Sequence, residues 1–121
     1  MKLRIHKNSI RLRLSQQEVD KIGQGSPIIE MIEMGMGKEN NFGYSLSPLD
    51  HIDEISAQYV QNILKISFPG HLAKEWASSE MVSVSNGADN NLSILIEKDF
   101  QCLHQRPDED ESDNFPNPDA Q

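Results

Sequence analysis

The segment LRIHKNSIRLRL, residues 3–14, alternates apolar and polar residues with a period of two. This period is typical of half-buried strands and not of a helix. A two-residue turn at Lys7 and Asn8 pairs two strands so that Ile5 faces Ile10 and residue 3 faces residue 12. The sequence therefore predicts that the fold begins with a β-hairpin that has one apolar face.

The other face of this hairpin carries cations, because the same register pairs Arg4 with Arg11 and Lys2 with Arg13. Like charges directly opposite each other destabilise paired strands unless a negative group lies between them. We therefore expect Lys2, Arg4, Arg11 and Arg13 to form an anion-binding face for carboxylates or phosphates. The alternative is a solvated outer face with spread side chains, which costs only on the order of tenths of a kcal/mol per pair.

Beyond the hairpin, Ser15 and Glu18 form a capping box, which predicts a helix of about two turns with Val19 and Ile22 facing inward. Alternating apolar residues and turn signals predict further strands and a second short helix over 71–78, with residues 47–51 as a loop. The further strands are expected at 28–34, 42–46, 55–59, 63–68, 81–84 and 92–96.

Strands outnumber helices, and most connections are too short for parallel crossovers. We therefore predict an α+β fold: a mainly antiparallel, curled or partly closed β-sheet with two short helices and an acidic C-terminal tail. No internal repeat is evident in the sequence. A length of 121 residues is enough for one core, so we expect a single domain over 1–105 followed by a tail over 106–121.

Charge is distributed unevenly along the chain, whose net charge is −8. Residues 1–13 hold five cations and no acid, whereas residues 106–121 hold six acids and one arginine. A nucleic-acid partner is disfavoured, because neutralising phosphates along a strand requires many Lys and Arg on one surface.

No apolar run exceeds three residues, which excludes a membrane span and a secretory signal and predicts a cytoplasmic protein without membrane contact. Cys102 is the only cysteine, so no intrachain disulfide can form. Cys102 and His104 are two possible metal ligands, but burial of a lone cysteine is the favoured interpretation. We predict no metal site, no cofactor and no catalytic residue.

The tail joins an acidic run to Asn114-Phe115-Pro116, whereas a tail that only solubilises needs no aromatic residue there. Ordering six residues costs about 6–12 kcal/mol of backbone entropy. Exposed ion pairs return about 0–1 kcal/mol each and burial of Phe115 about 1.5–3 kcal/mol. Docking on the cationic face therefore needs backbone hydrogen bonds or a site for Phe115; otherwise the tail is disordered or engages another chain. The predicted anchor residues are Asp110, Glu111, Asp113, Phe115 and Pro116.

Residues 3–14, and residues 97–104 running into 109–118, resemble a family of short bacterial proteins known only as a domain of unknown function. The resemblance implies that the tail belongs to the domain, and it brings no activity or cofactor. The triphosphate tunnel metalloenzymes also combine a small barrel with a charged face, but their Glu-x-Glu-x-Lys pattern is replaced here by Lys2-Leu3-Arg4-Ile5-His6.

The first functional hypothesis is a small non-enzymatic binding domain whose cationic face engages an acidic protein segment, a phosphate-bearing ligand or its own tail. The alternative is a phosphate- or triphosphate-handling metal-dependent enzyme. In that case Arg4, Arg11 and Arg13 would hold the substrate, and Glu30 or Glu33 would bind the metal. A third possibility is a homo-oligomer that uses a sheet edge.

Overall fold

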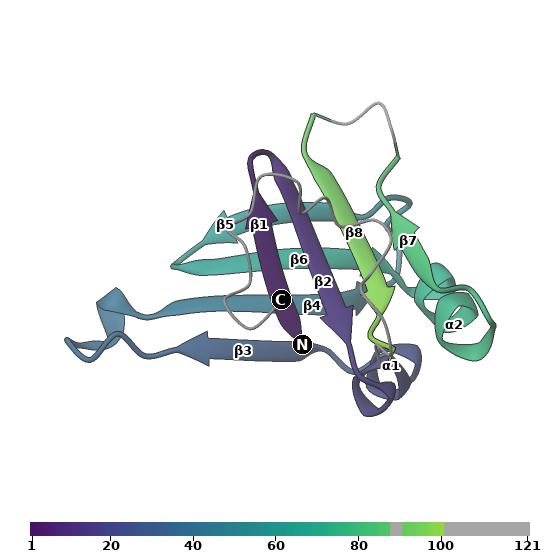
Figure 1. Cartoon of the computed structure of the whole chain (residues 1–121), viewed down its shortest axis with the longest axis horizontal. Coiled ribbons are helices and arrows are strands. Elements are labelled where there is room, and N and C mark those ends of the chain that lie inside the picture. The colour runs from purple at the N-terminus through teal and green to yellow at the C-terminus, as the bar shows by residue number, and fades with distance from the viewer. Residues whose placement is uncertain (88–90, 101–121) are drawn as a thin grey trace, which may run out of the picture.

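The computed structural model describes residues 1–87 and 91–100, and within these it contains eight strands and two α-helices (Figure 1). In chain order the elements are β1 (Lys2–His6), β2 (Ser9–Leu14), α1 (Gln16–Gly23), β3 (Ile28–Ile32), a 3₁₀ helix η1 (Lys38–Asn40), β4 (Phe42–Leu49), β5 (Ser56–Val60), β6 (Ile63–Pro69), α2 (Gly70–Ser78), β7 (Ser83–Ser85) and β8 (Ser93–Lys98). The predicted domain boundary at residue 105 lies outside the described residues.

The first hairpin has the predicted register. Ile5 pairs with Ile10 and Leu3 with Leu12 across antiparallel β1 and β2, and the turn falls at residues 7 and 8. The side chains of Ile10, Leu12 and Leu14 are buried, so the apolar face of the hairpin is its inner face.

The capping box that predicted α1 is also present. The Glu18 backbone N–H donates to Ser15 Oγ over 3.4 Å, and the Ser15 N–H donates to Glu18 Oε1 over 2.9 Å. Val19 and Ile22 are buried, as their spacing predicted. The cap satisfies donors that the first helical turn would otherwise leave without partners.

The predicted α+β class with two helices is confirmed, and four of the six strand pairs among the described residues are antiparallel, but the prediction of one curled or partly closed sheet is wrong. The strands form two separate mixed sheets, neither closed nor strongly curled: a first sheet in the order β1-β2-β8-β7 and a second in the order β3-β4-β6-β5. Each sheet joins two antiparallel hairpins through parallel inner strands, β2 with β8 and β4 with β6. The short connections correctly indicated the hairpins, but they carry no information on how one hairpin pairs with another.

Within the described residues the fold consists of two halves with the same topology, although the sequence shows no evident repeat. Each half is a hairpin, a helix and a second hairpin: β1-β2-α1-β3-β4 and β5-β6-α2-β7-β8. The N-cap of α1, Ser15, directly follows the end of β2, and the N-cap of α2, Pro69, is the last residue of β6. Each hairpin position can therefore be matched to its counterpart by counting back from the cap. Each sheet contains one hairpin from each half.

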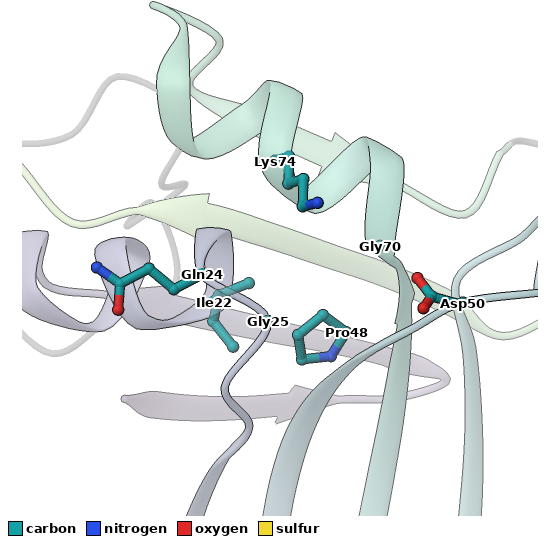
Figure 2. Close-up of a pocket in the computed structure, with 7 residues that line it drawn as sticks. All are labelled: Ile22, Gln24, Gly25, Pro48, Asp50, Gly70 and Lys74. Carbon is teal, nitrogen blue, oxygen red and sulfur yellow. The ribbon is translucent and has the colours of Figure 1, made fainter.

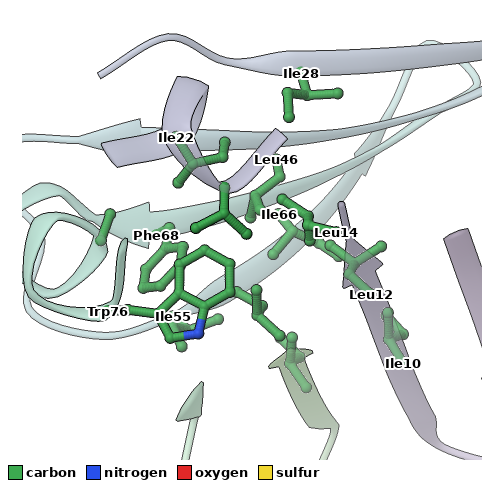
Figure 3. Close-up of a cluster of buried hydrophobic side chains, with 14 residues drawn as sticks. Ile10, Leu12, Leu14, Ile22, Ile28, Leu46, Ile55, Ile66, Phe68 and Trp76 are labelled. Carbon is green, nitrogen blue, oxygen red and sulfur yellow. The ribbon is translucent and has the colours of Figure 1, made fainter. Parts of the chain in front are cut away.

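The two sheets face each other with their strands crossing, and both helices lie together at one end (Figure 1). Between the layers lies one core (Figure 3). Its largest members are Trp76 and Phe68, whose ring centroids are 5.6 Å apart, and Trp76 Nε1 donates to the Val82 carbonyl over 3.1 Å. Among the described residues no helix is long and apolar enough to cross a membrane.

Candidate functional site

The cationic face lies on the outer side of the first sheet. Because successive strand residues point to opposite faces, burial of Leu12 and Leu14 directs Arg11 and Arg13 away from the core. Register places Arg4 directly opposite Arg11, and Lys2 opposite Arg13. All four predicted cations are therefore on one face, in the pairs that the sequence predicted.

Glu97 of β8 lies beside the two β2 arginines, in register with Arg13. Arg13 Nε donates to Glu97 Oε1 over 2.6 Å, and Arg11 Nε lies 3.7 Å from the same oxygen. The side chains of Arg11, Arg13 and Glu97 are 26%, 16% and 13% exposed. Charges that are this well covered are screened less by salt than surface charges are. One carboxylate therefore sits between two guanidinium groups in a partly desolvated cluster.

A second acid lies at the start of β1. Lys2 Nζ lies 2.9 Å from Asp99 Oδ2, and the Asp99 N–H donates to the Leu14 carbonyl over 2.9 Å. Counting these named groups, the four cations and the acids Glu97 and Asp99 sum to a formal charge of +2. The named part of the face is therefore positive, in a chain whose net charge is −8.

The repeated topology offers an internal comparison for this face. Counting back from the helix caps, Arg11 corresponds to Lys65 and Arg13 to Ser67 on the outer side of the second sheet. The β5 residues paired with those two positions are Gln58 and Ser56. The counterpart of Glu97 is Ser47, which is in register with Ser67. The same fold position therefore holds one cation in the second sheet and four in the first.

Glu30, the metal ligand of the alternative hypothesis, does not join the arginines. It pairs with Tyr44 on the inner face of the second sheet, and its Oε1 lies 3.5 Å from the Met1 ammonium. The Tyr44 hydroxyl donates to the Met1 carbonyl over 2.8 Å. Burial, with Glu30 and Glu18 nearby, raises the pKa of Tyr44. Glu33 follows β3 and is exposed. Within residues 1–87 and 91–100 no cluster of three or more His, Cys, Asp or Glu could hold a metal.

A pocket of about 250 Å³ lies between the end of α1, the end of β4 and the start of α2 (Figure 2). Its charged lining residues are Asp50 and Lys74, which have opposite sign. The pocket is at the helical end of the molecule, so it is not part of the cationic face.

The predicted tail anchors, Asp110, Glu111, Asp113, Phe115 and Pro116, lie outside the described residues, as do Cys102 and His104. Sequence reasoning missed Glu97 as a member of the site. Strand residues alternate between faces, so Glu97 lies on the outer face opposite the buried Ile94 and Ile96. Only the pairing of β8 with β2 brings Glu97 to the arginines.

Comparison with known proteins adds a family and no activity. No curated protein and no solved structure matches the chain at a significant level. The model of one family, described as a family of unknown function, matches residues 1–119 and so includes both the described fold and the tail. The chain therefore belongs to the family of unknown function DUF7009.

Proposed function

We propose that this protein is a small binding domain whose cationic face, Lys2, Arg4, Arg11 and Arg13, engages the carboxylates of an acidic protein segment or the oxygens of a phosphate-bearing ligand. Guanidinium groups suit this task because their planar donor fork matches carboxylate and phosphate geometry.

The single observation that carries the proposal is the contrast between equivalent positions of the two sheets. In the second sheet the places of the four cations are taken by one cation and three uncharged residues. These residues are Lys65, Ser56, Gln58 and Ser67. The fold therefore does not need charge at these positions. Paired like charges oppose strand pairing, so their presence in one sheet alone favours a role in binding an anion.

Glu97 supports the proposal by orienting the arginines. Its Oε1 contacts Arg13 and lies 3.7 Å from Arg11, which restricts both side chains while leaving the cluster of three with a formal charge of +1. Long side chains that are already ordered lose less entropy when they bind a ligand. The cluster is thus partly preorganised for a further anion.

Binding of a fluorescein-labelled hexaglutamate to the 121-residue chain, measured by anisotropy, tests the proposal. The combined variant Arg4→Gln and Arg11→Gln removes two charges, and we expect affinity to fall roughly 5–30-fold, from up to about 1 kcal/mol per exposed pair. Inorganic triphosphate, added as a competitor with and without Mg²⁺, reports whether phosphate oxygens use the same face.

The matched control is Lys65→Gln, which removes the one cation at the equivalent position of the second sheet. We expect this variant to bind hexaglutamate like the natural chain. Thermal unfolding of each variant verifies that the fold is retained. If Lys65→Gln lost half as much binding free energy as the arginine variant, as one charge against two requires, only net charge would matter, and the proposal would then be wrong.

A further inference from the structure

A partly exposed cluster of apolar side chains lies on the inner face of the second sheet, at the edge of the core. Ile32 is the strand partner of Phe42. Leu64 is the strand partner of Tyr44 on one side and of Tyr59 on the other. The Phe42 ring centroid lies 6.3 Å from that of Tyr44 and 6.4 Å from that of Tyr59. We call this cluster the aromatic shelf; its members are Ile32, Phe42, Tyr44, Tyr59 and Leu64.

The aromatic shelf continues the core into solvent. Tyr44 and Leu64 pack against the buried cluster, whereas Ile32 is 47% and Tyr59 60% exposed. In Figure 1 β1 crosses β4 and β6 of the second sheet, and the hydrogen bond from the Tyr44 hydroxyl to the Met1 carbonyl links its start to one member of the shelf. Ile5 of β1 is also exposed although it points to the inner side. An apolar segment placed here would therefore pack against the second sheet, with β1 beside it.

The end of the described chain lies beside the start of β1, where the neighbouring residue Met1 accepts a hydrogen bond from Tyr44 of the shelf. Asp99 is held to Leu14 by its backbone and to Lys2 by its carboxylate. Phe115 is fifteen residue steps beyond Phe100, and an extended chain of that length spans about 50 Å, against about 17 Å for the five residues of β1. Phe115 is therefore within reach of the shelf.

The chain after residue 100 carries acidic residues first and an aromatic residue second, which suits the cationic face and then the aromatic shelf. Five acids lie between residues 108 and 113, and they precede Phe115, the only large apolar residue after position 105. Pro116 and Pro118 favour an extended conformation that loses little entropy on docking, and proline-rich segments characteristically bind to surfaces lined by aromatic rings.

We propose that the occupant of the aromatic shelf is this chain's own segment Asn114–Pro118, with the Phe115 ring against Phe42 and Tyr59 and the preceding acids on the cationic face. The docking of the acidic residues on the cationic face rests on the proposed function, whereas the docking of Phe115 on the shelf does not. The tail then acts as an intramolecular competitor of outside anions. A partner must displace both the acids and the aromatic ring to bind.

Photo-crosslinking in the 121-residue chain tests the position of the ring. With p-benzoylphenylalanine in place of Phe115, irradiation followed by trypsin should join residues 99–121 to residues 39–65, the tryptic peptide that carries four of the five shelf residues. Mixing ¹⁵N-labelled and unlabelled chains separates crosslinks within one chain from those between chains. The same photoreactive residue at Gln121 is the control for reaction without a defined site.

Tyr59→Ser should reduce the yield of the 39–65 crosslink at least fivefold. The equally exposed Ile29→Ser, on the outer face of the same sheet, should leave it unchanged. Crosslinks that are only intermolecular, that join other peptides, or that match the Gln121 control would overturn the inference. The probe does not depend on the arginines, so a positive crosslink together with unaltered hexaglutamate binding in the arginine variant would retain the shelf and reject the proposed function.

The competitor role has its own readout. The amide variant of the tail, with Asp108→Asn, Glu109→Gln, Asp110→Asn, Glu111→Gln and Asp113→Asn, should bind hexaglutamate at least fivefold more tightly than the natural chain. Equal affinities would show that the tail does not occupy the cationic face.

Discussion

Arg13 and Glu97 lie on neighbouring parallel strands 84 residues apart in sequence, and their side chains are joined by a 2.6 Å hydrogen bond. The same Glu97 oxygen lies 3.7 Å from Arg11. Two guanidinium groups that would repel each other along β2 are thus held together by one carboxylate.

Glu97→Gln keeps a side-chain oxygen that can accept from Arg13 Nε, so the arginines remain oriented, and it removes one negative charge from the cationic face. Affinity for hexaglutamate should therefore rise up to about fivefold. The same change should lower the free energy of unfolding by about 1–3 kcal/mol, since a hydrogen bond to a charged group is weakened. Anisotropy and urea unfolding measure the two effects. Glu54→Gln, at an exposed position away from the face, is the control. Weaker binding by Glu97→Gln would contradict this prediction and would show that orienting the arginines requires the charge of Glu97.

Ser15→Ala should lower the free energy of unfolding by about 1 kcal/mol, because the Ser15 hydroxyl accepts the Glu18 backbone N–H at the start of α1. For a chain of this size the melting temperature should fall by roughly 3–6 °C. Ser26→Ala, at an exposed position after the helix, should change it little. Equal shifts for the two variants would mean that the cap contributes nothing.

Glu18 should make stability depend on pH in the acid range. Burial raises the pKa of Glu18, but hydrogen bonds from the Met1 ammonium and the Ser15 N–H outweigh this effect, so its pKa lies below the ordinary value. A carboxyl with a depressed folded pKa stabilises the protein above its unfolded pKa of about 4.3, and this contribution is lost as the pH falls through the folded value.

Urea unfolding from pH 7 to pH 3 measures this dependence. The difference in unfolding free energy between the natural chain and Glu18→Gln should be constant near pH 7 and shrink below about pH 4.3. The exposed Glu80→Gln serves as the control variant. A difference that stays flat to pH 3 would show that the Glu18 charge does not stabilise the fold.

Gly23→Ala should destabilise the contact between α1 and α2. A Cβ at position 23 would lie 2.5 Å from the Ala77 Cβ, closer than two carbons can approach. Overpacking of this kind costs about 1–3 kcal/mol, which outweighs a helix-propensity gain of up to about 1 kcal/mol. Combining Gly23→Ala with Ala77→Gly should cost less than the sum of the single changes, as thermal unfolding of the three variants would reveal. Simple additivity would contradict the close approach.

Much of the local structure could be predicted because its signals lie within a few residues of each other. The register of β1 with β2 follows from a two-residue turn and the alternation of residues 3–14. The start of α1 follows from the reciprocal groups of Ser15 and Glu18. The pairing of Arg4 with Arg11 is a consequence of the same register.

Other elements could not be predicted, because their conformation depends on neighbours that are distant in sequence. Pro48 indicated a loop, yet β4 continues through Leu49. The pairing of β3 with β4 reaches no further than Leu46, so on that side Pro48 is free of the ladder that its missing N–H would interrupt. The aromatic shelf was missed for a similar reason: Phe42 and Tyr59 come together only across an intervening strand, β6.

The sequence by itself determined where the hairpins and helices lie, apart from the end of β4, and which face of β1 and β2 carries the cations, because alternation, turns and caps act over a few residues. Only the tertiary structure decided that β2 pairs with β8 and β4 with β6, and so that Glu97 meets Arg11 and Arg13. The physical reason is that backbone hydrogen bonds at the edge of a hairpin do not distinguish one partner strand from another. The choice is made by how the two apolar faces pack around Trp76, Phe68 and Leu12.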